Sequence, residues 1–452
     1  MQTRRQSPFR RAILVLCWLL LVPQTLFAQG IIRDPDIEHA LGKLAEPVLS
    51  AAGLNPGHVK IIMINDSSMN AFVIDRRHIF IHTGMILKMK RAAELQGVIA
   101  HEAAHIANGH ITRRAVNAGG ASSLAKLGLL LGAAAAAASG RGDVGLAVAA
   151  GTAGSARRGL LGHTRAEEAS ADQASFRYMA RAGIDPNGII DVLDIFAGQE
   201  SLALNRQDAY ARSHPLSRDR LRAAKGFAAA YEGKTKPQAE ADYWFTRAKI
   251  KLEAFVRNPK SVLRKAKNGD TSELAQLRRA IGYHRLAQGD KAAAAINAVV
   301  AMRPNDPYYQ ELRAQILYES RQYSAATNAY AKAVSLAPRN ALILAGYGRS
   351  LLALDTRDSN KKALDVLVKA AGRDANDPRM LRDLAVAYAK NGNNGMASLV
   401  TAERYALLGR FDDAALHANR ALGQLPGGSA GSRKAQDIVF IAKNAPRKGR
   451  KR

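Results

Sequence analysis

The sequence predicts an α+β domain, mostly helical with a small β hairpin or sheet, followed by an all-α repeat domain. Three observations lead to this expectation. Aromatic residues make up only 6% of the 452 residues while Ala is abundant, which favours helices over a β sandwich or barrel. Strand-like runs occur only near the start of the chain. A pattern of small and apolar residues recurs roughly every 34 residues in the second half.

Residues 1–28 have the layout of a secretory signal peptide. Arg4, Arg5, Arg10 and Arg11 form a basic start, the apolar run Ala12–Val22 follows, and cleavage is expected after Ala28. The alternative is an uncleaved membrane anchor, but the apolar run is far shorter than the ~20 residues needed to span a bilayer. We therefore expect export, and in a Gram-negative bacterium a periplasmic mature protein.

The chain is strongly basic, with 66 Lys+Arg against 38 Asp+Glu and a formal net charge of +28. The signal peptide carries four of these charges and the basic tail, residues 446–452, carries five, which leaves a surplus of about nineteen. Export makes an anionic membrane surface or an acidic client a better partner than nucleic acid, which we do not expect. A generally solvated basic surface is the alternative.

A single cysteine, Cys17, lies inside the predicted signal peptide. Its removal would exclude disulfides, thiolate metal sites and cysteine nucleophiles. Any metal must then be held by His, Asp or Glu.

The first domain is predicted to span residues 29–235. It begins with a helix at Ile37–Ala52, a strand at His58–Ile64 and a hairpin at Phe72–Met85. The apolar helix Ala92–Ala115 comes next and contains no proline up to Ile111. The remainder, from about residue 121 to 232, is expected to be helical.

A Gly/Ala-rich stretch, Leu124–Ala153, interrupts this helical part. Its two apolar arms, Leu124–Ala138 and Val144–Ala153, are each too short to span a bilayer. A buried helical hairpin is one interpretation. A hydrophobic element that contacts the membrane or an unfolded client is the other, and the sequence leaves the choice open.

The second domain, residues 240–445, carries the recurring pattern. Its registers are Ala292, Ile296, Val299, Pro304; Ala326, Tyr330, Ala333, Pro338; and Ala414, Ala418, Ala421, Pro426. Small residues twelve positions earlier, Ala280, Ala314 and Ala402, mark where two helices of a unit cross closely. The pattern resembles the tetratricopeptide repeat, a solenoid of helix pairs, rather than a generic Ala-rich bundle. Ala363, Leu367 and Ala370 indicate a degenerate further unit, so the number of units stays open.

His101-Glu102-Ala-Ala-His105 is the most informative motif. On a helix, residues four apart share a face, so both imidazoles can bind one metal ion. Glu102 is one position away and can point toward a water beside that metal. Two ordinary histidines on a core or surface helix are the alternative.

A catalytic zinc site needs a third protein ligand. Glu168 and Asp172 lie four residues apart on a later predicted helix. Glu168 would complete a His₂Glu site for one zinc ion per chain, and Asp172 would hydrogen-bond a ligand imidazole. Glu167 is the competing ligand.

These motifs together resemble the gluzincin family that includes HtpX and the CAAX prenyl endopeptidases, whose fold is of the zincin type. Further matches are Asn70-Ala71-Phe72, the hairpin Ile79–Gly84, and Ser213-His214-Pro215-Leu216 with Arg220. Ser170 departs from the acidic residue common at its position.

The resemblance implies a zinc metalloendopeptidase. Zinc would polarise the scissile carbonyl and acidify a water, and Glu102 would take the proton of that water and deliver it to the leaving amine. His214 would lie near the metal, either as a gating ligand or as a hydrogen-bond donor to the tetrahedral intermediate. The hairpin Phe72–His82 would offer an edge strand for an extended substrate.

Members of this family that combine a signal peptide with repeats also suggest partners. They imply misfolded or unassembled outer-membrane proteins as clients and the β-barrel assembly machinery as a docking partner of the repeats. The chain would then be a protease of periplasmic quality control, with peripheral membrane contact. A chaperone or assembly adaptor with a shut or vestigial peptidase site is the alternative.

Overall fold

The computed structural model describes residues 30–112 and 165–445, apart from 204–205, 232, 234 and 267–268. The predicted signal peptide, the stretch Leu124–Ala153 and the basic tail lie outside the described residues. Among the helices that are described, none is both long and apolar enough to cross a membrane.

Four short strands form one mixed sheet in the order β1-β2-β4-β3. Their bounds are β1 (Ile31–Ile32), β2 (Lys60–Ile64), β3 (Ala71–Val73) and β4 (His78–His82). β2 and β4 run parallel, while β1 and β3 are antiparallel to their neighbours. The predicted hairpin is therefore present as β3 and β4. Of these two strands, only β3 lies at an edge of the sheet, because β4 also pairs with β2.

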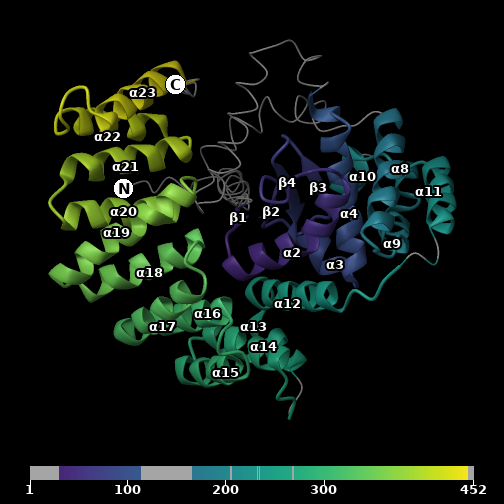
Figure 1. The fold of residues 1–452 in the computed structure, drawn as a ribbon, viewed down its shortest axis with the longest axis horizontal. Coiled ribbons are helices and arrows are strands. Elements are labelled where there is room, and N and C mark those ends of the chain that lie inside the picture. Colours follow the sequence, from purple (N-terminus) through teal and green to yellow (C-terminus); the bar gives the residue numbers. More distant parts are fainter. Residues whose placement is uncertain are drawn as a thin grey trace, which may run out of the picture.

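Helices α2 (Pro35–Ala51), α3 (Thr83–Lys88) and α4 (Ala92–Ala107) pack against this sheet, and α10 (Ala209–Ser213) contacts β3. A further layer follows on the far side of α4 (Figure 1): α8 (Arg165–Arg181) and α9 (Asn187–Phe196) pack on α4, and α11 (Arg218–Ala230) packs on α8 and α9. The 3-10 turn η1 (Gln199–Ser201) follows α9. Ile61, Met63, Ile79 and Ile81 alternate toward α2 and α4 and form the core with them. The predicted helix Ala92–Ala115 is interrupted after Ala107, because Gly109 takes a φ of 70° and turns the chain, and helical structure resumes at His110.

α12 (Ala239–Val256) connects the two parts of the chain. Its Phe245 and Leu252 belong to the core of the sheet domain, whereas its Ile250 and Ala254 belong to the first apolar cluster of the following helices. α12 therefore packs against both parts, immediately after the predicted boundary.

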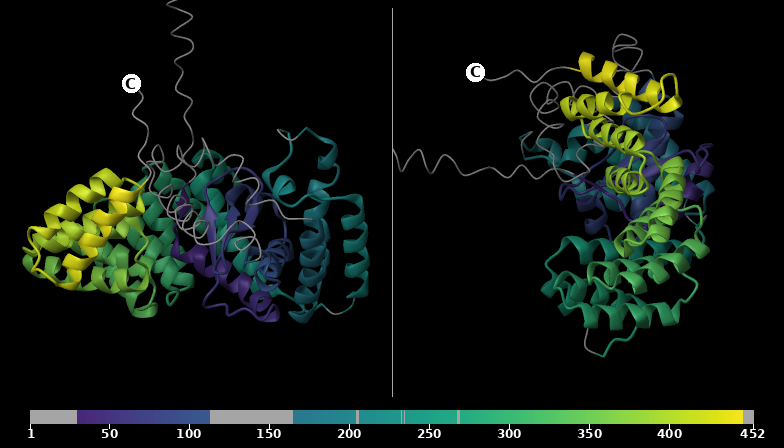
Figure 2. Two further views of the ribbon diagram at one scale, coloured as in Figure 1. Left: turned by 90° about the horizontal axis from the view of Figure 1, so that it is seen from above. Right: turned by 90° about the vertical axis from the view of Figure 1, so that its left-hand side faces the viewer.

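Paired antiparallel helices follow and stack into a solenoid, which lies to one side of the sheet domain (Figure 2). Their bounds are α13 (Pro259–Lys265), α14 (Glu273–Arg285), α15 (Gly289–Met302), α16 (Pro307–Glu319), α17 (Tyr323–Leu336), α18 (Ala341–Leu354), α19 (Arg357–Arg373), α20 (Pro378–Lys390), α21 (Asn394–Leu407), α22 (Phe411–Leu422) and α23 (Ala430–Asn444). Asp306 and Asp377 cap α16 and α20, each followed by proline at the first helical position.

The predicted repeat registers are confirmed by this packing. Ala292, Ala326 and Ala414, and the crossing residues Ala280, Ala314 and Ala402, are all fully buried. The degenerate unit is also present as α18 and α19, with Ala363, Leu367 and Ala370 buried. The fold is thus an α+β domain followed by a tetratricopeptide-type solenoid.

A buried ionic cluster, which we call the junction cluster, joins the two parts. Arg247 on α12 contacts Asp36 at 2.9 Å and Asp306 at 2.6 Å, and Lys251 contacts Asp34 at 2.9 Å. Both cationic side chains are fully buried. Arg33 adds a further link to Asp374 in the solenoid at 2.6 Å.

Candidate metal centre

α4 carries three buried polar side chains at the centre of the sheet domain. His101, Glu102 and His105 are 4%, 0% and 0% exposed, on a helix that is buried along nearly its whole length. Such burial of polar groups is costly unless each finds a partner. A binding role would supply that partner.

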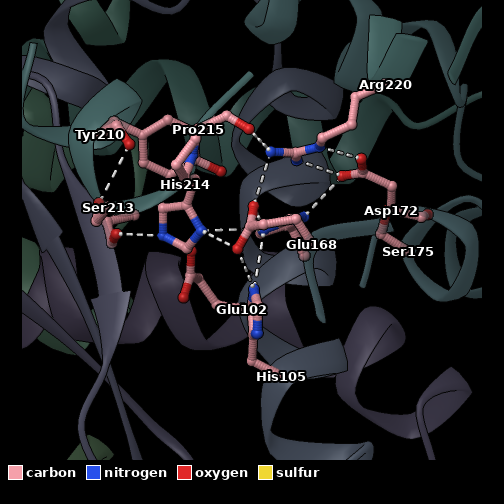
Figure 3. Close-up of polar contacts among 12 residues, drawn as sticks. Glu102, His105, Glu168, Asp172, Ser175, Tyr210, Ser213, His214, Pro215 and Arg220 are labelled. Carbon is pink, nitrogen blue, oxygen red and sulfur yellow. Dashed lines mark hydrogen bonds and ion pairs between the residues drawn. The ribbon is translucent and has the colours of Figure 1, made fainter. Parts of the chain in front are cut away.

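Glu168 on α8 and His214, which follows α10, meet these histidines. The ligating atoms of His101, His105, Glu168 and His214 all lie within 4.8 Å of one another. Figure 3 shows the Glu168 carboxylate between the imidazoles of His105 and His214. Glu168 is fully buried, whereas Glu167 is only half-buried and is not part of this cluster. The distances thus favour Glu168 over Glu167 as the carboxylate partner.

The separations within the cluster fit a small metal ion. His101 Nε2 is 3.1 Å from His105 Nε2 and 3.3 Å from His214 Nδ1, and the oxygens of Glu168 are 3.1–3.5 Å from all three rings. Ligands bound at 2.0–2.1 Å to a tetrahedral ion are separated by about 3.3 Å. Five of the six separations among the four residues therefore match those of a tetrahedral site, and the sixth, between His105 and His214, is at most 4.8 Å.

The outer nitrogen of each imidazole is held by a second group. His101 Nδ1 is 3.1 Å from Asp172, His105 Nδ1 is 2.9 Å from His110, and His214 Nε2 is 3.3 Å from the Ala71 carbonyl. Donation of the outer N–H to these partners leaves the inner nitrogen lone pair directed at the cluster, as in metal-binding histidines.

The electrostatics also call for a positive charge at this position. Burial opposes a charged His101, but its hydrogen bonds with Asp172 and Glu168 outweigh burial and raise its pKa to about 10. Burial likewise opposes a charged Glu168, yet His214, together with hydrogen bonds from His101 and His105, holds the pKa of Glu168 well below its usual range. The carboxylates thus stabilise a cation among the imidazoles, which a metal ion can supply.

Arg220 on α11 orients both carboxylates. Its guanidinium binds Asp172 through Nε at 2.7 Å and Nη2 at 2.9 Å, and its Nη1 contacts Glu168 at 2.9 Å. The same Nη1 donates to the Pro215 carbonyl at 2.6 Å. One side chain therefore ties α8 to the segment that carries His214 (Figure 3).

His214 lies between Glu102 and the edge strand β3. Its Nε2 is 3.4 Å from Glu102 Oε1, and the Tyr210 ring lies 4.5 Å from the His214 ring. The Tyr210 backbone N–H donates to the Met69 carbonyl at 3.1 Å, while His214 contacts the Ala71 carbonyl. Residues 210–214 thus contact the backbone carbonyls of two alternate residues, Met69 and Ala71, along the free edge of the sheet.

The structure brings all six predicted site residues into this one cluster: Glu102, His214, Asp172, His101, His105 and Glu168. The sequence alone indicated no role for Arg220, Tyr210 or His110. His110 is five residues after His105, outside helical spacing, and only the turn at Gly109 brings it back. Arg220 belongs to one of the motifs that carry the family resemblance, but its contacts are set by tertiary structure.

Comparison with known proteins gives the following similarities. Residues 33–228 match the family described as Peptidase family M48. The chain is 24% identical over 407 residues to the beta-barrel assembly-enhancing protease of Escherichia coli K12, covering 88% of this chain and 81% of that protein. A relative from Vibrio cholerae is 26% identical over 295 residues, covering 62% of this chain and 58% of its own length.

More distant similarities cover smaller parts of the chain. Metalloprotease LoiP of Escherichia coli K12 is 27% identical over 211 residues, covering 44% of this chain and 73% of that protein. A solved structure described as a thermophilic TPR protein of Thermus thermophilus covers 37% of this chain and 100% of its own, with 19% identity and a TM-score of 0.27.

Proposed function

We propose that this chain, in which residues 33–228 form a metalloprotease domain of peptidase family M48, is an exported zinc endopeptidase of envelope protein quality control. The observation that carries the proposal is the convergence of His101, His105, Glu168 and His214 within 4.8 Å. The relatives' names supply the setting, β-barrel assembly.

One zinc ion per chain suits the donors of this cluster. Histidine nitrogens and one carboxylate are typical zinc ligands, and His101, His105 and Glu168 would hold the ion. When bound, zinc would polarise the scissile carbonyl and make a nearby water more acidic. His214 lies at the fourth coordination position, which water or substrate must occupy during catalysis.

Glu102 is placed to move the proton. It is adjacent to a ligand histidine on α4, fully buried, and shares no part of the four-donor set. Its carboxylate would accept a proton from the attacking water and pass it to the leaving amine, which contributes roughly 10²–10⁴-fold to rate. Glu102 and the neighbouring His105 and Glu168 are all 0% exposed, so the transfer would take place away from bulk water.

Asp172 and Arg220 would act on the ligands rather than on the substrate. Asp172 fixes the tautomer of His101, and Arg220 fixes both carboxylates. The contacts of Arg220 with Asp172 and Glu168 keep the metal-binding side chains in one geometry, as a zinc site requires.

The second candidate, an assembly adaptor with a shut peptidase site, is favoured by one observation. His214 lies beside the other three metal-binding residues, and residues 210–214 contact the carbonyls of Met69, just before β3, and of Ala71, the first residue of β3, where an extended substrate would pair. Opening of this segment would convert the shut site into the active one, so a single chain can serve both functions at different times.

The cellular setting is part of the same proposal. The predicted signal peptide favours the periplasm, and the relatives' printed name favours outer-membrane β-barrel proteins as clients. The solenoid would capture these clients or dock on the β-barrel assembly machinery, since stacked helical repeats present extended binding surfaces.

Zinc content and proteolysis of the full chain test the catalytic part. We expect the wild type to contain one zinc per chain by mass spectrometry and to cleave casein or an unassembled outer-membrane protein. Glu102→Gln should keep the zinc and lose cleavage, while the exposed control Glu46→Gln should keep both. Cleavage by Glu102→Gln at the wild-type rate would overturn the mechanism.

Capture of clients tests the setting. The full-length Glu102→Gln protein, expressed in its native compartment and crosslinked, should retain outer-membrane proteins. Recovery from the cytoplasmic fraction, or retention of soluble periplasmic proteins alone, would refute the proposed setting. Truncation at residue 240 is unsuitable for this purpose, because α12 supplies Phe245 and Leu252 to the core of the sheet domain.

A further inference from the structure

A large cavity lies between the sheet domain and the solenoid, away from the metal cluster. Its volume is about 1190 Å³. β1, β2 and the start of α2 form one wall, and α16, α18 and the connection from α19 to α20 form the other. Small-molecule pockets usually measure about 300–1000 Å³, so this space is better matched to a polypeptide segment.

Part of the cavity wall is apolar. The partly exposed side chains of Ile31 and Ile62 line it from the sheet, and those of Phe255 and Tyr318 line it from α12 and α16. Such side chains can accept a bulky apolar residue of a ligand, because burial of that residue stabilises the complex by about 25 cal/mol per Å² of apolar surface.

The solenoid wall carries an excess of positive charge, with six arginines against Glu311, Glu319, Asp374 and Asp377. Arg339, Arg373 and Arg379 line the cavity, are solvent-exposed, and make no ion pair with any residue that the structure describes. Arg33 on the opposite wall is paired with Asp374, Arg349 and Arg382 are paired with Asp383, and Arg404 donates to the Pro378 carbonyl. The three free guanidinium groups are therefore available to a ligand.

A buried acid, Glu311, also lines the cavity. It is 7% exposed, and its Oε2 has no hydrogen-bond partner among the described residues. Burial raises the pKa of Glu311 to about 8, which leaves it largely uncharged at neutral pH. It therefore does not cancel the arginines, and its O–H can donate to a carbonyl or carboxylate oxygen.

We propose that this interdomain cavity binds an extended polypeptide segment in which an apolar side chain is flanked by carboxylates. The apolar wall receives the side chain, and Arg339, Arg373 and Arg379 bind the acidic residues through charge-assisted hydrogen bonds. The proposal rests on the proposed role of the repeat domain in client capture and is independent of catalysis.

The cavity and the metal cluster lie at different parts of the sheet. The cavity is lined by β1, β2 and the β4 residues His78 and Phe80, whereas His214 contacts the Ala71 carbonyl on β3. None of the four metal-cluster residues lines the cavity, so capture and cleavage would use different segments of one client.

Peptide binding to the full-length Glu102→Gln protein tests this inference. The probe is a fluorescein-labelled peptide with a Phe-Leu core flanked by Asp and Glu, and matched peptides carry Gln or Lys at the flanks. Fluorescence anisotropy should show binding of the acidic peptide, at least ten-fold weaker binding of the Gln peptide, and weakening of the acidic peptide by added salt. Equal binding of acidic and Lys-flanked peptides would overturn the proposal.

Two triple variants with the same loss of charge make the test specific. Arg339→Gln/Arg373→Gln/Arg379→Gln should weaken acidic-peptide binding at least ten-fold. Arg177→Gln/Arg222→Gln/Lys225→Gln, three exposed positions on α8 and α11, should change it less than two-fold. Equal effects would mean that general charge attraction alone holds the peptide and would refute the site.

Two further measurements separate peptide capture from membrane attachment and from catalysis. If the cavity variant lost binding to phosphatidylglycerol vesicles but not to the peptide, the arginines would serve a membrane surface and the proposal would be wrong. Casein cleavage by the cavity variant, made with Glu102 intact, should match the wild type. Failure of peptide binding with intact cleavage would reject the cavity alone, whereas absence of cleavage in the wild type would reject the catalytic proposal alone.

Discussion

Two buried polar clusters in this chain differ in composition: one consists mainly of groups that can bind a metal ion, and the other pairs cations with carboxylates. In the metal cluster, three imidazole nitrogens and the Glu168 carboxylate face one another at 3.1–3.5 Å. In the junction cluster, the cationic donors Arg247 and Lys251 face the carboxylates of Asp34, Asp36 and Asp306. Both clusters are almost completely buried.

This difference distinguishes a binding site from a structural contact. The junction cluster is complete without any ligand, because its guanidinium and ammonium groups supply the positive charge. In the metal cluster, Arg220 pairs with Glu168 and Asp172 from outside, while the inner nitrogens of three imidazoles and the Glu168 carboxylate converge on one point where a metal ion would bind. An excess of convergent acceptors is therefore the stronger sign of a ligand, even where the burial is equal.

Removal of one metal-binding side chain from the metal cluster should have the largest effect on zinc binding and cleavage. We expect His105→Ala to lose zinc and to lower casein cleavage at least ~1000-fold, because both the Lewis acid and its geometry are lost. The exposed control His58→Ala should match the wild type in zinc content and rate. Full zinc occupancy in His105→Ala would show that the cluster is not the metal site.

Loss of one cation from the junction cluster should act on stability instead. Arg247→Ala leaves buried carboxylates unpaired and should lower the free energy of unfolding by about 3–5 kcal/mol, measured by urea denaturation, with zinc content per folded chain unchanged. Arg303→Ala, which breaks a half-exposed pair with Glu273, should cost less than about 1 kcal/mol. An equal loss of unfolding free energy in the two variants would show that the buried junction cluster contributes no more to stability than a surface ion pair.

A smaller effect is expected from Arg220, which supports the metal cluster without being a donor to the metal. Arg220→Lys keeps the charge but cannot bind Asp172 through two nitrogens, so zinc affinity should fall about 10–100-fold. Competition with a chelator measures this change. Arg222→Lys, two residues away on the exposed face of α11, should leave the affinity unaltered, and an unaltered affinity in Arg220→Lys would exclude a positioning role.

The smallest expected effect concerns Glu311, an acid beside the junction cluster. Its folded-state pKa of about 8 lies above the ordinary value near 4.5, so the native state holds a proton that the unfolded state has released between these values. Wild-type stability should therefore fall as the pH rises through this window, by about 1 kcal/mol between pH 7 and pH 8 from this group. Glu311→Gln should lack that fall, and parallel pH profiles of the two proteins would disprove the raised pKa.

Much of this architecture could be predicted from local sequence. The repeat registers follow from the period of two packed helices, and the buried alanines Ala292, Ala326 and Ala414 confirm them. The pairing of His101 with His105 follows from helical spacing. The hairpin was also predictable, but the insertion of β4 between β2 and β3 was not, because strand order depends on which backbone edges meet after folding.

By itself, the sequence determined which residues could share a helix face and where helix pairs would repeat, since both depend on spacings of a few residues. Only the tertiary structure decided which distant groups meet. His214 reaches His101 across 113 positions, Arg220 reaches Asp172 across 48, and Arg247 reaches Asp36 across 211. These contacts depend on how α8, α11 and α12 pack, and the interdomain cavity likewise depends on how α12, the junction cluster and the Arg33–Asp374 pair hold the solenoid beside the sheet domain.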